Sequence, residues 1–291
     1  MTGVLVVGDV IDDIHVGLEH PFRVDTDTEA TIRRTRGGSA ANTAVWLAST
    51  GTPVTFVGRV GAEDEARVLA DFDAASVQAH LQLDSTRPTG TIVIVVHQET
   101  RTMLSDRGAN VALEWDAIPD ALVNKAGLVH LTGYGVFHHA SPQSVTAFIE
   151  RAKRLGSTVT LDASSAGFLE DFGPTRFLEV IQGVDVLRCN RDEGLVLTSE
   201  TSIENAGVRL ARNFASVIIT DGSRGAHVFT SNSHTLIPAA PHGDIVDPTG
   251  AGDAFDAGVL RGLSLGESLE DAASRGAALA AHAVMTVGAR P

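Results

Sequence analysis

Two glycines and a carboxylate stand together in the sequence DPTGAGD at residues 247–253. The segment directly precedes an expected helix over residues 254–263. The glycines allow backbone N–H groups to converge on one point, and the helix N-terminus adds a positive electrostatic end. Asp253, in the first helical turn, is placed to accept the proton of a hydroxyl group. The pattern therefore indicates phosphoryl transfer, which needs an anion site and a base; a plain helix cap is the alternative.

Other anion-binding patterns fit these residues less well. A dinucleotide-binding fingerprint needs a third glycine where the chain has Phe255. A Walker loop needs four residues between its glycines and then Lys, and the sequence has neither feature here. The eleven histidines include no pair four positions apart around a Glu, so a metal hydrolase of that type is not indicated.

A second glycine pair, Gly37-Gly38, precedes a run of small residues that begins with Ser39 and contains Asn42. Adjacent glycines allow a ligand or a neighbouring strand to approach the backbone closely. Asn42 lies on the first turn of a helix expected over residues 40–49, where its amide could bind a substrate hydroxyl. A helix cap followed by tight packing is the alternative.

Two further junctions after apolar strands carry polar residues. Asn190 and Glu193 share one face of a starting helix. They could hold a hydrated Mg²⁺, which keeps several waters, or they could form a capping box. The turn TDGSRG at residues 220–225 could contact the phosphate or ribose of a nucleotide, and a simple glycine turn is the alternative.

Short β-branched runs alternate with helical patterns along most of the chain. Candidate strands occur at residues 4–7, 54–57, 128–131, 158–161, 184–187 and 217–220. Several of them are continuously apolar, as is typical of strands covered on both faces. Helical periodicity occupies residues 40–49, 63–75, 142–155, 203–213, 254–263 and 269–284. This alternation predicts an α/β fold with a mostly parallel central sheet flanked by helices. Ligands of such sheets bind at the carboxyl ends of the strands.

Two stretches depart from this alternation. Residues 12–36 show no helical period, and residues 91–96 and 100–106 predict a hairpin. We expect them to form a small β-sheet, made by about 12–36 and 90–107, which is either a lid over the ligand cleft or an ordinary extra sheet. We expect residues 1–291 to form a single domain, of which this small sheet is a part. Exposed edges of such a sheet can pair with a second copy, which predicts a homodimer.

The composition limits the partners of the chain. It has 36 acidic and 22 basic residues, a formal net charge of −14, so we expect no nucleic-acid partner. The short basic cluster at residues 33–36 is expected to be a solvated strand face. The single Cys189 is expected to be a packed thiol, which fits a reducing compartment. No apolar run approaches ~18 residues and no leader pattern opens the chain, so we expect a cytoplasmic protein with no membrane partner.

The four motifs, in this order and at these intervals, resemble those of the ribokinase-like (PfkB) carbohydrate kinases over essentially the full chain. The matching residues are Gly37-Gly38 with Asn42, Asn190-x-x-Glu193, Thr220-x-Gly222-Ser223-x-Gly225 and Asp247-x-x-Gly250-Ala251-Gly252-Asp253. The last motif is highly specific and the first moderately so. The resemblance implies a ribokinase-like fold and an ATP-dependent kinase that acts on an alcohol.

The resemblance also implies roles for the catalytic and acceptor-binding residues. Asp253 would be the base, and the anion hole would comprise Gly250, Ala251 and Gly252. The acceptor would contact Asp13, Gly38, Ser39 and Asn42. Asp9 and Asp12, near Asp13 in the sequence, are expected to be solvated loop acids.

Further roles implied by the resemblance concern the nucleotide and its ions. ATP and Mg²⁺ would contact Asn190, Glu193, Thr220, Gly222, Ser223, Gly225 and His282. Many members of the family bind K⁺ beside the anion hole; here the ion would lie near Asp247, Thr249, Ala283 and Gly288.

The sequence departs from the family pattern in ways that bear on the substrate. Ser39 stands where many ribose-specific members carry Lys, so the resemblance does not extend to ribose specificity. Residues 132–134 and 161–165 resemble nucleoside kinases as much as sugar kinases. Tyr134 could stack on a base or a sugar face, with core packing as the alternative. The predicted function is a sugar kinase; a nucleoside kinase and a non-catalytic sugar-binding regulator are the alternatives.

Overall fold

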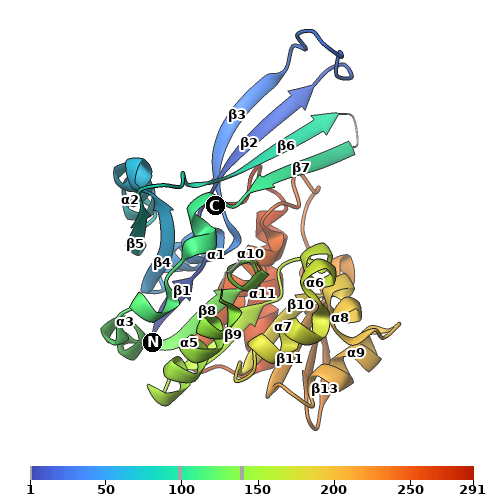
Figure 1. Ribbon diagram of the computed structural model, residues 1–291. Helices are drawn as coiled ribbons and strands as arrows, with labels where there is room; N and C mark the ends of the chain where they lie inside the picture. Colours follow the sequence, from blue (N-terminus) through green and yellow to red (C-terminus); the bar gives the residue numbers. More distant parts are fainter. Residues whose placement is uncertain (1, 98–99, 138–140) are drawn as a thin grey trace.

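A nine-stranded sheet lies at the centre of the computed structural model, which describes residues 2–97, 100–137 and 141–291 (Figure 1). Its strand order is β13-β12-β11-β10-β9-β8-β1-β4-β5. The strands from β11 to β5 run parallel, and β12 and β13 add an antiparallel edge. The strands are β1 (Gly3–Val7), β4 (Val54–Gly61), β5 (Gln78–Asp84), β8 (Ala126–Thr132), β9 (Thr158–Asp162), β10 (Val186–Asn190), β11 (Ser216–Thr220), β12 (Ala226–Thr230) and β13 (His234–Ile237).

Helices cover both faces of this sheet, which explains why its strands are apolar on both sides. Along β1, Leu5 and Val7 join one core and Val4 and Val6 join the other. The first core is covered by α3 (Asp120–Lys125), α4 (Tyr134–Phe137), α5 (Pro142–Arg154), α6 (Ala166–Phe172), α7 (Pro174–Val180), α8 (Arg191–Thr198) and α9 (Ile203–Leu210). The opposite face is covered by α1 (Ser39–Ser49), α2 (Glu65–Ala74), α10 (Ala251–Ser264) and α11 (Leu269–Ala283).

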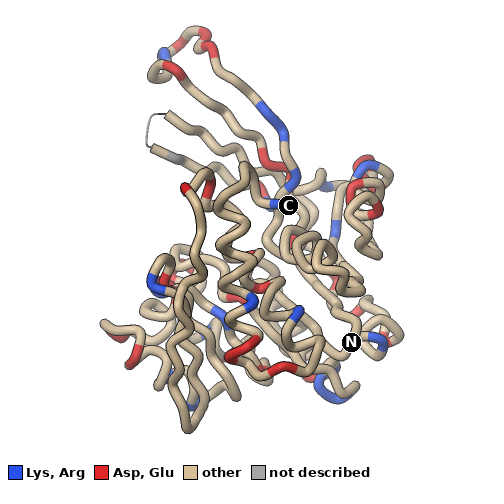
Figure 2. The backbone as a smooth tube through the Cα atoms, turned by 180° about the vertical axis from the view of Figure 1, so that it is seen from behind, with Lys and Arg blue, Asp and Glu red and all other residues tan. Residues whose placement is uncertain are grey.

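Four further strands form a separate sheet, called the small sheet below. Its order is β3-β2-β6-β7, and its strands are β2 (Ile11–Leu18), β3 (Thr31–Gly37), β6 (Gly90–His97) and β7 (Thr100–Asp106). It projects from the end of the large sheet where β1 leads into β2 (Figure 1). Basic residues lie along β3, and acidic residues lie at the tip of the small sheet that is farthest from the large sheet (Figure 2). Arg33 and Arg34 are exposed as predicted, whereas Arg36 pairs with Asp12 and Asp71.

The predicted fold class is confirmed, and the predicted strands and helices match observed elements with small shifts at their ends. Strand β5 was not predicted, because its sequence QAHLQLD is polar and forms an exposed part of the edge. Cys189 is buried, as expected. None of the described helices combines the length and the apolar character needed to cross a membrane. Short 3-10 turns complete the structure: Ala62–Asp64, Gly108–Ala112, Trp115–Ala117 and Gly222–Arg224.

Candidate active site

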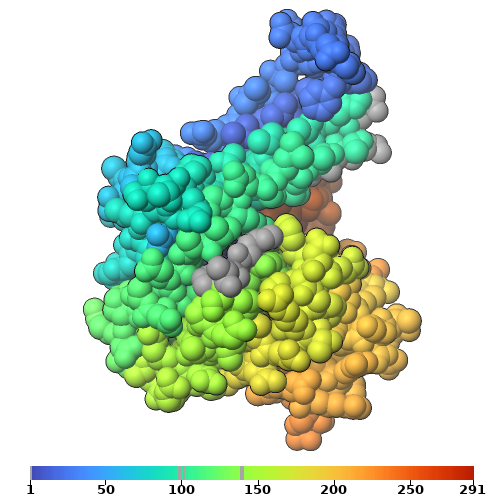
Figure 3. All heavy atoms as spheres, viewed as in Figure 1, coloured from blue at the N-terminus to red at the C-terminus, as the bar shows by residue number. Residues whose placement is uncertain are grey.

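Two adjoining cavities lie at the carboxyl ends of the parallel strands, on the side of the small sheet. One, of about 340 Å³, reaches from the end of β1 to the small sheet and is called the acceptor cavity. The other, of about 290 Å³, lies between β11 and the helices α10 and α11 and is called the nucleotide cavity. In Figure 3 the small sheet projects from the body, and the surface is hollowed beneath it. Their position agrees with the expected binding edge of an open parallel sheet.

Asp253 lies in the wall of the acceptor cavity, in the first turn of α10. Its Oδ1 accepts a 2.7 Å hydrogen bond from Ser39 Oγ, and its Oδ2 accepts a 2.9 Å bond from Asn42 Nδ2. Burial raises the pKa of Asp253 to about 7, although both hydrogen bonds act to lower it. A carboxyl group that titrates near neutral pH is suited to act as a base there.

The glycine pair at 37–38 brings α1 close to the end of β1. Gly38 has φ +94°, and a Cβ there would lie 2.5 Å from the carbonyl oxygen of Asp9. The Asp9 carboxylate caps α1 by accepting bonds from the N–H groups of Ser39 and Ala40 at 3.3 and 3.1 Å. The expectation that Asp9 is a solvated loop acid is therefore wrong, because capping requires it to be buried.

Asp12 and Asp13 lie on neighbouring positions of β2 and point to opposite faces of the small sheet. Asp12 is also buried, contrary to expectation, because Arg36 and Arg67 pair with its carboxylate. Asp13 lines the acceptor cavity, as predicted, and its carboxylate lies against the backbone of Gly37, where a Cβ would be 2.2 Å away.

Arg290 was not foreseen as a site residue. Its Nε donates to Asn42 Oδ1 at 2.8 Å, and its Nη2 donates to the Gly37 carbonyl at 3.1 Å. Burial lowers the pKa of Arg290 to about 10, so it remains charged at neutral pH. No motif spacing could reveal it, because its contacts with Asn42 and Gly37 join residues far apart in the sequence.

Arg107 and Tyr134 form another part of the acceptor cavity wall. The guanidinium of Arg107 lies over the Tyr134 ring, 4.1 Å from its centroid, and 3.5 Å from Asp9 Oδ2. Tyr134 therefore lines the cavity, although it also packs against the neighbouring core as the alternative reading expected. Ile92, Ile94 and Met103 of the small sheet complete the wall with apolar side chains.

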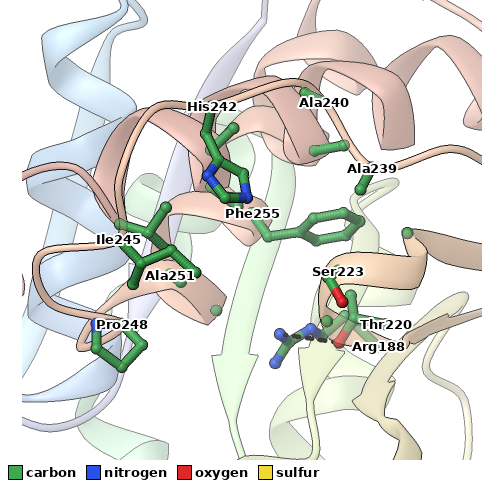
Figure 4. A pocket seen from close by; sticks show the side chains of 17 residues that line it. Arg188, Thr220, Ser223, Ala239, Ala240, His242, Ile245, Pro248, Ala251 and Phe255 are labelled. Atoms are coloured by element: carbon green, nitrogen blue, oxygen red, sulfur yellow. Dashed lines mark hydrogen bonds between the residues drawn. The ribbon is translucent and has the colours of Figure 1, made fainter.

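The nucleotide cavity begins at the predicted turn, since Thr220, Gly222, Ser223 and Gly225 all line it. Its other end is mostly apolar and suits a planar base; it is formed by Ala239, Ala240, His242, Ile245, Ala277, Ala280, Ala281 and Val284 (Figure 4). His282 lies outside both cavities, and its ring contacts Trp46 edge-on with centroids 6.0 Å apart. The His282 side chain is thus directed toward Trp46 and not into the nucleotide cavity, and its predicted nucleotide contact stays a prediction.

The start of α10 lies between the two cavities. Gly250, with φ +79°, passes so close to the C-terminal segment that a Cβ would be 2.6 Å from Ala289 O. Ala251 lines the nucleotide cavity, and Gly252 lines both. The first N–H groups of a helix have no acceptor within it, so this turn presents donors and a positive end to an anion.

Asn190 and Glu193 form the capping box that was the alternative to a metal site. The carboxylate oxygens of Glu193 accept from Asn190 N and Nδ2, both at 2.7 Å. Burial, followed by the Asp162 charge, raises the pKa of Glu193 to about 7. Both residues line the acceptor cavity. Within the described residues, no group of three or more His, Cys, Asp or Glu side chains could hold a metal ion.

The residues predicted to bind K⁺ lie near one another, and several of their polar groups take part in hydrogen bonds within the protein. The Asp247 carboxylate accepts from the N–H groups of Thr249 and Gly288 at 2.9 and 3.1 Å, which ties two loops together. The Ala283 carbonyl accepts from Thr286 N and Oγ1 at 3.1 and 2.9 Å. This arrangement does not fit a K⁺ site that uses the Ala283 carbonyl, so no role of K⁺ is derived from it.

Comparison with known proteins agrees with this geometry. Residues 1–291 match the pfkB family of carbohydrate kinases. An ATP-dependent ribose-1-phosphate kinase of Halopiger xanaduensis is 31% identical over 84% of this chain and 81% of its own length. An adenosine kinase of Saccharomyces cerevisiae is 27% identical over 87% of this chain and 78% of its own. The solved structure of Arabidopsis thaliana ribokinase with ribose and ATP is similar at a TM-score of 0.84, with 26% identity, and covers 99% of this chain and 95% of its own. The chain therefore belongs to the pfkB family of carbohydrate kinases and is an ATP-dependent phosphotransferase of the ribokinase type.

Proposed function

We propose that this kinase phosphorylates a hydroxyl group of a small sugar or sugar-like substrate, with Asp253 as the general base. The single observation that carries the proposal is the place of Asp253, whose carboxylate lines the acceptor cavity one residue after Gly252, at the boundary with the nucleotide cavity. ATP would occupy the nucleotide cavity, with its terminal phosphate at the N-terminus of α10. The acceptor hydroxyl would attack from the other side and lose its proton to Asp253.

The polar groups around Asp253 support a neutral polyol as the acceptor. Asp13 and Asn42 lie on the same cavity wall, and carboxylates and amides bind vicinal hydroxyls well. The cavity lining carries more carboxylates than guanidinium groups, which disfavours an acidic acceptor. The carboxylates are Asp9, Asp13, Asp162, Glu193 and Asp253; the guanidinium groups are Arg107 and Arg188.

A nucleoside is the second candidate acceptor, on one observation. Ile92, Ile94 and Met103 line the acceptor cavity with apolar side chains, and the Tyr134 ring lines the same cavity. A free pentose has little surface for these groups, whereas a base would bury area against them. The adenosine kinase relative is compatible with this alternative.

Mg²⁺ would reach the site only through water. Asn190 and Glu193 satisfy each other directly, so their outer faces are suited to hydrogen-bond hydration waters of the ion. When bound with ATP, such an ion would neutralise phosphate charge during transfer.

We propose that the small sheet is a lid and also the contact between two copies in a homodimer. Its cavity face carries Asp13, Ile92, Ile94 and Met103. By strand alternation and register its opposite face carries Ile14, Val16, Ile32, Val93 and Leu104. Ile32 and Leu104 are 67% and 60% exposed, and an apolar face of this kind favours burial against a second copy. Leu104→Glu should convert a dimer into a monomer in light scattering; a wild-type monomer at micromolar concentration would contradict the proposal.

A substrate panel tests the proposed function. Purified enzyme is incubated with ATP, Mg²⁺ and each of a set of pentoses, ketoses, sugar acids and nucleosides, and ADP release is measured against a no-acceptor control. Acceptor-dependent ADP release with a sugar supports the first candidate, and preference for a nucleoside supports the second. Tight sugar binding without any turnover would contradict both candidates and favour a non-catalytic regulator.

A further inference from the structure

Among the residues that the structure describes, two line both the acceptor cavity and the nucleotide cavity: Gly252 and Arg188. Gly252 contributes backbone at the start of α10, and Arg188 contributes a guanidinium from β10. Both residues therefore lie at the boundary between the two cavities. Arg188 belongs to none of the four sequence motifs, so motif spacing gave no reason to consider it.

Side chains on three sides hold the Arg188 guanidinium in place. Nη1 donates to Asp162 Oδ1 at 2.7 Å, and Nε lies 3.8 Å from Asp256 Oδ1. Nη2 makes a long contact of 3.5 Å with Thr220 Oγ1, on the edge of the nucleotide cavity (Figure 4). Burial alone would lower the pKa of Arg188, but Asp162 and Asp256 raise it well above its ordinary value. The side chain is therefore a fixed cation with little freedom to move.

The same nitrogen lies against the anion-binding turn. A Cβ built on Gly252 would be 2.9 Å from Arg188 Nη2, so the guanidinium occupies the space beside the Gly252 backbone. Within the described part of the chain, Nη2 hydrogen-bonds only to Thr220, through the long 3.5 Å contact, whereas Nη1 donates to Asp162. Nη2 is therefore available as a hydrogen-bond donor beside the first N–H groups of α10.

We propose that Arg188 is a catalytic residue, whose Nη2 binds an oxygen of the phosphoryl group while that group passes from ATP to the acceptor. The proposal rests on the proposed placement of ATP and acceptor in the two cavities. In the step, the acceptor oxygen forms a bond to the γ-phosphorus and the bond to the β,γ-bridging oxygen breaks. The hydroxyl proton goes to Asp253, and ADP leaves with the electron pair of the broken bond.

Charge balance explains why the site needs this cation. The acceptor cavity is lined by carboxylates, among them Asp162, Glu193 and Asp253. A phosphoryl group approaching Asp253 meets like charge, which raises the barrier unless a fixed positive group lies nearby. Arg188 supplies it at the boundary of the cavities, and its planar donors suit phosphate oxygens better than the point charge of a lysine.

A purely structural role of Arg188, as the counter-ion of Asp162 and Asp256, makes different predictions. In that case its loss would lower stability but leave kcat of the folded protein intact. Arg188→Gln and Arg188→Lys separate the two roles. Gln removes the positive charge, whereas Lys keeps it but lacks the planar set of N–H donors. Arg209→Gln is the control, since Arg209 is 58% exposed and pairs with Glu200 on the surface.

The experiment measures kcat, KM for ATP and ADP affinity for the wild type and these three variants, with concentrations of folded sites taken from ADP titration. We expect kcat to fall by about 10²–10³ in Arg188→Gln and at least about tenfold in Arg188→Lys. ADP affinity should stay within about threefold, because the group acts on the phosphoryl in transit. Arg209→Gln should match the wild type.

A second readout is binding of ADP with aluminium fluoride, a planar stand-in for the transferring phosphoryl group, in the presence of acceptor. The wild type should bind ADP at least about tenfold more tightly when the fluoride is present, and Arg188→Gln should lose this gain. Should Arg188→Gln not fold, Arg188→Lys decides by the same readouts. Wild-type kcat in either folded variant overturns the proposal. Absence of turnover by the wild type with every acceptor would instead overturn the proposed function itself.

Discussion

The hydroxyl of Ser39 donates a 2.7 Å hydrogen bond to Oδ1 of Asp253, although 214 positions separate the two residues in the chain. The bond joins the first turns of α1 and α10, the two helices that follow the glycine motifs. With the bond from Asn42 to Oδ2, it fixes both oxygens of the carboxylate. The two motifs therefore meet at one place, where residues of α1 orient the Asp253 carboxylate carried by α10.

Ser39→Ala should shift the pH dependence of kcat. The Ser39 hydrogen bond favours the charged form of Asp253, so its removal should raise the pKa of Asp253 above the value of about 7 in the wild type. The base must be ionised to work, so the acidic limb of the kcat profile should move to higher pH by about 0.5–1 unit. Steady-state kinetics from pH 5.5 to 9 would measure this shift.

Ser49→Ala is the matched control, because Ser49 lies at the end of the same helix and its hydroxyl donates to the Trp46 carbonyl. Its profile should follow that of the wild type. An unmoved acidic limb in Ser39→Ala, with full activity at pH 6, would show that Asp253 does not set the limb.

Asp253→Asn should stabilise the protein more at high pH than at low pH. The folded-state pKa of Asp253, about 7, is raised above its ordinary value of 3.8, so ionisation is easier in the unfolded chain. Its contribution to stability is therefore fully present below about pH 4 and is lost as the pH rises through 7. The amide of Asn does not ionise, so the variant does not lose this stability as the pH rises. The difference in Tm between variant and wild type should grow from pH 4.5 to pH 8, and a pH-independent difference would contradict the raised pKa.

Gly38→Ala should destabilise the fold and distort the active site. Its φ of +94° strains any side chain, and the new Cβ would lie 2.5 Å from the Asp9 carbonyl oxygen. Strain and overpacking together should cost about 2–5 kcal/mol in urea unfolding. Gly51 also has positive φ, +78°, but a Cβ there meets no atom within 4 Å, so Gly51→Ala should cost only about 1 kcal/mol. Equal costs for the two variants would rule out the close approach at Gly38.

Arg290→Met should weaken acceptor binding without weakening ATP binding. Arg290 holds Asn42 and the Gly37 backbone, both on the acceptor side, and it lines neither cavity. Its loss leaves the Asn42 amide free to turn away from Asp253, so KM for the acceptor should rise by about tenfold. KM for ATP should stay within about twofold. Arg275→Met, which breaks an exposed pair with Glu267, should change neither constant.

The fold could be predicted because its signals are local. The apolar runs of β1, β8 and β11 alternate with helical periods along the chain, a pattern typical of a parallel sheet covered by helices on both faces. Strand β5 escaped prediction because this edge strand has the sequence QAHLQLD. Its polar residues interrupt any continuous apolar run.

The site could be predicted only where glycine and carboxylate types are required at fixed spacing, as around Gly252 and Asp253. Asp9 was misread because its burial depends on α1, which follows some thirty positions later and offers it two N–H groups. Arg188 and Arg290 carry no spacing signal, since each acts through tertiary contacts with residues far away in the sequence. The direction of the His282 side chain, toward Trp46, could not be predicted because helical periodicity does not fix which face of α11 meets the nucleotide cavity.

The most direct test of the central claim is kcat of Asp253→Asn with the acceptor that the wild type uses best. If Asp253 takes the hydroxyl proton, kcat should fall by about 10²–10⁴. ATP affinity should stay within about threefold, because the nucleotide cavity does not include the carboxylate. A folded Asp253→Asn protein that retains wild-type kcat would contradict the account.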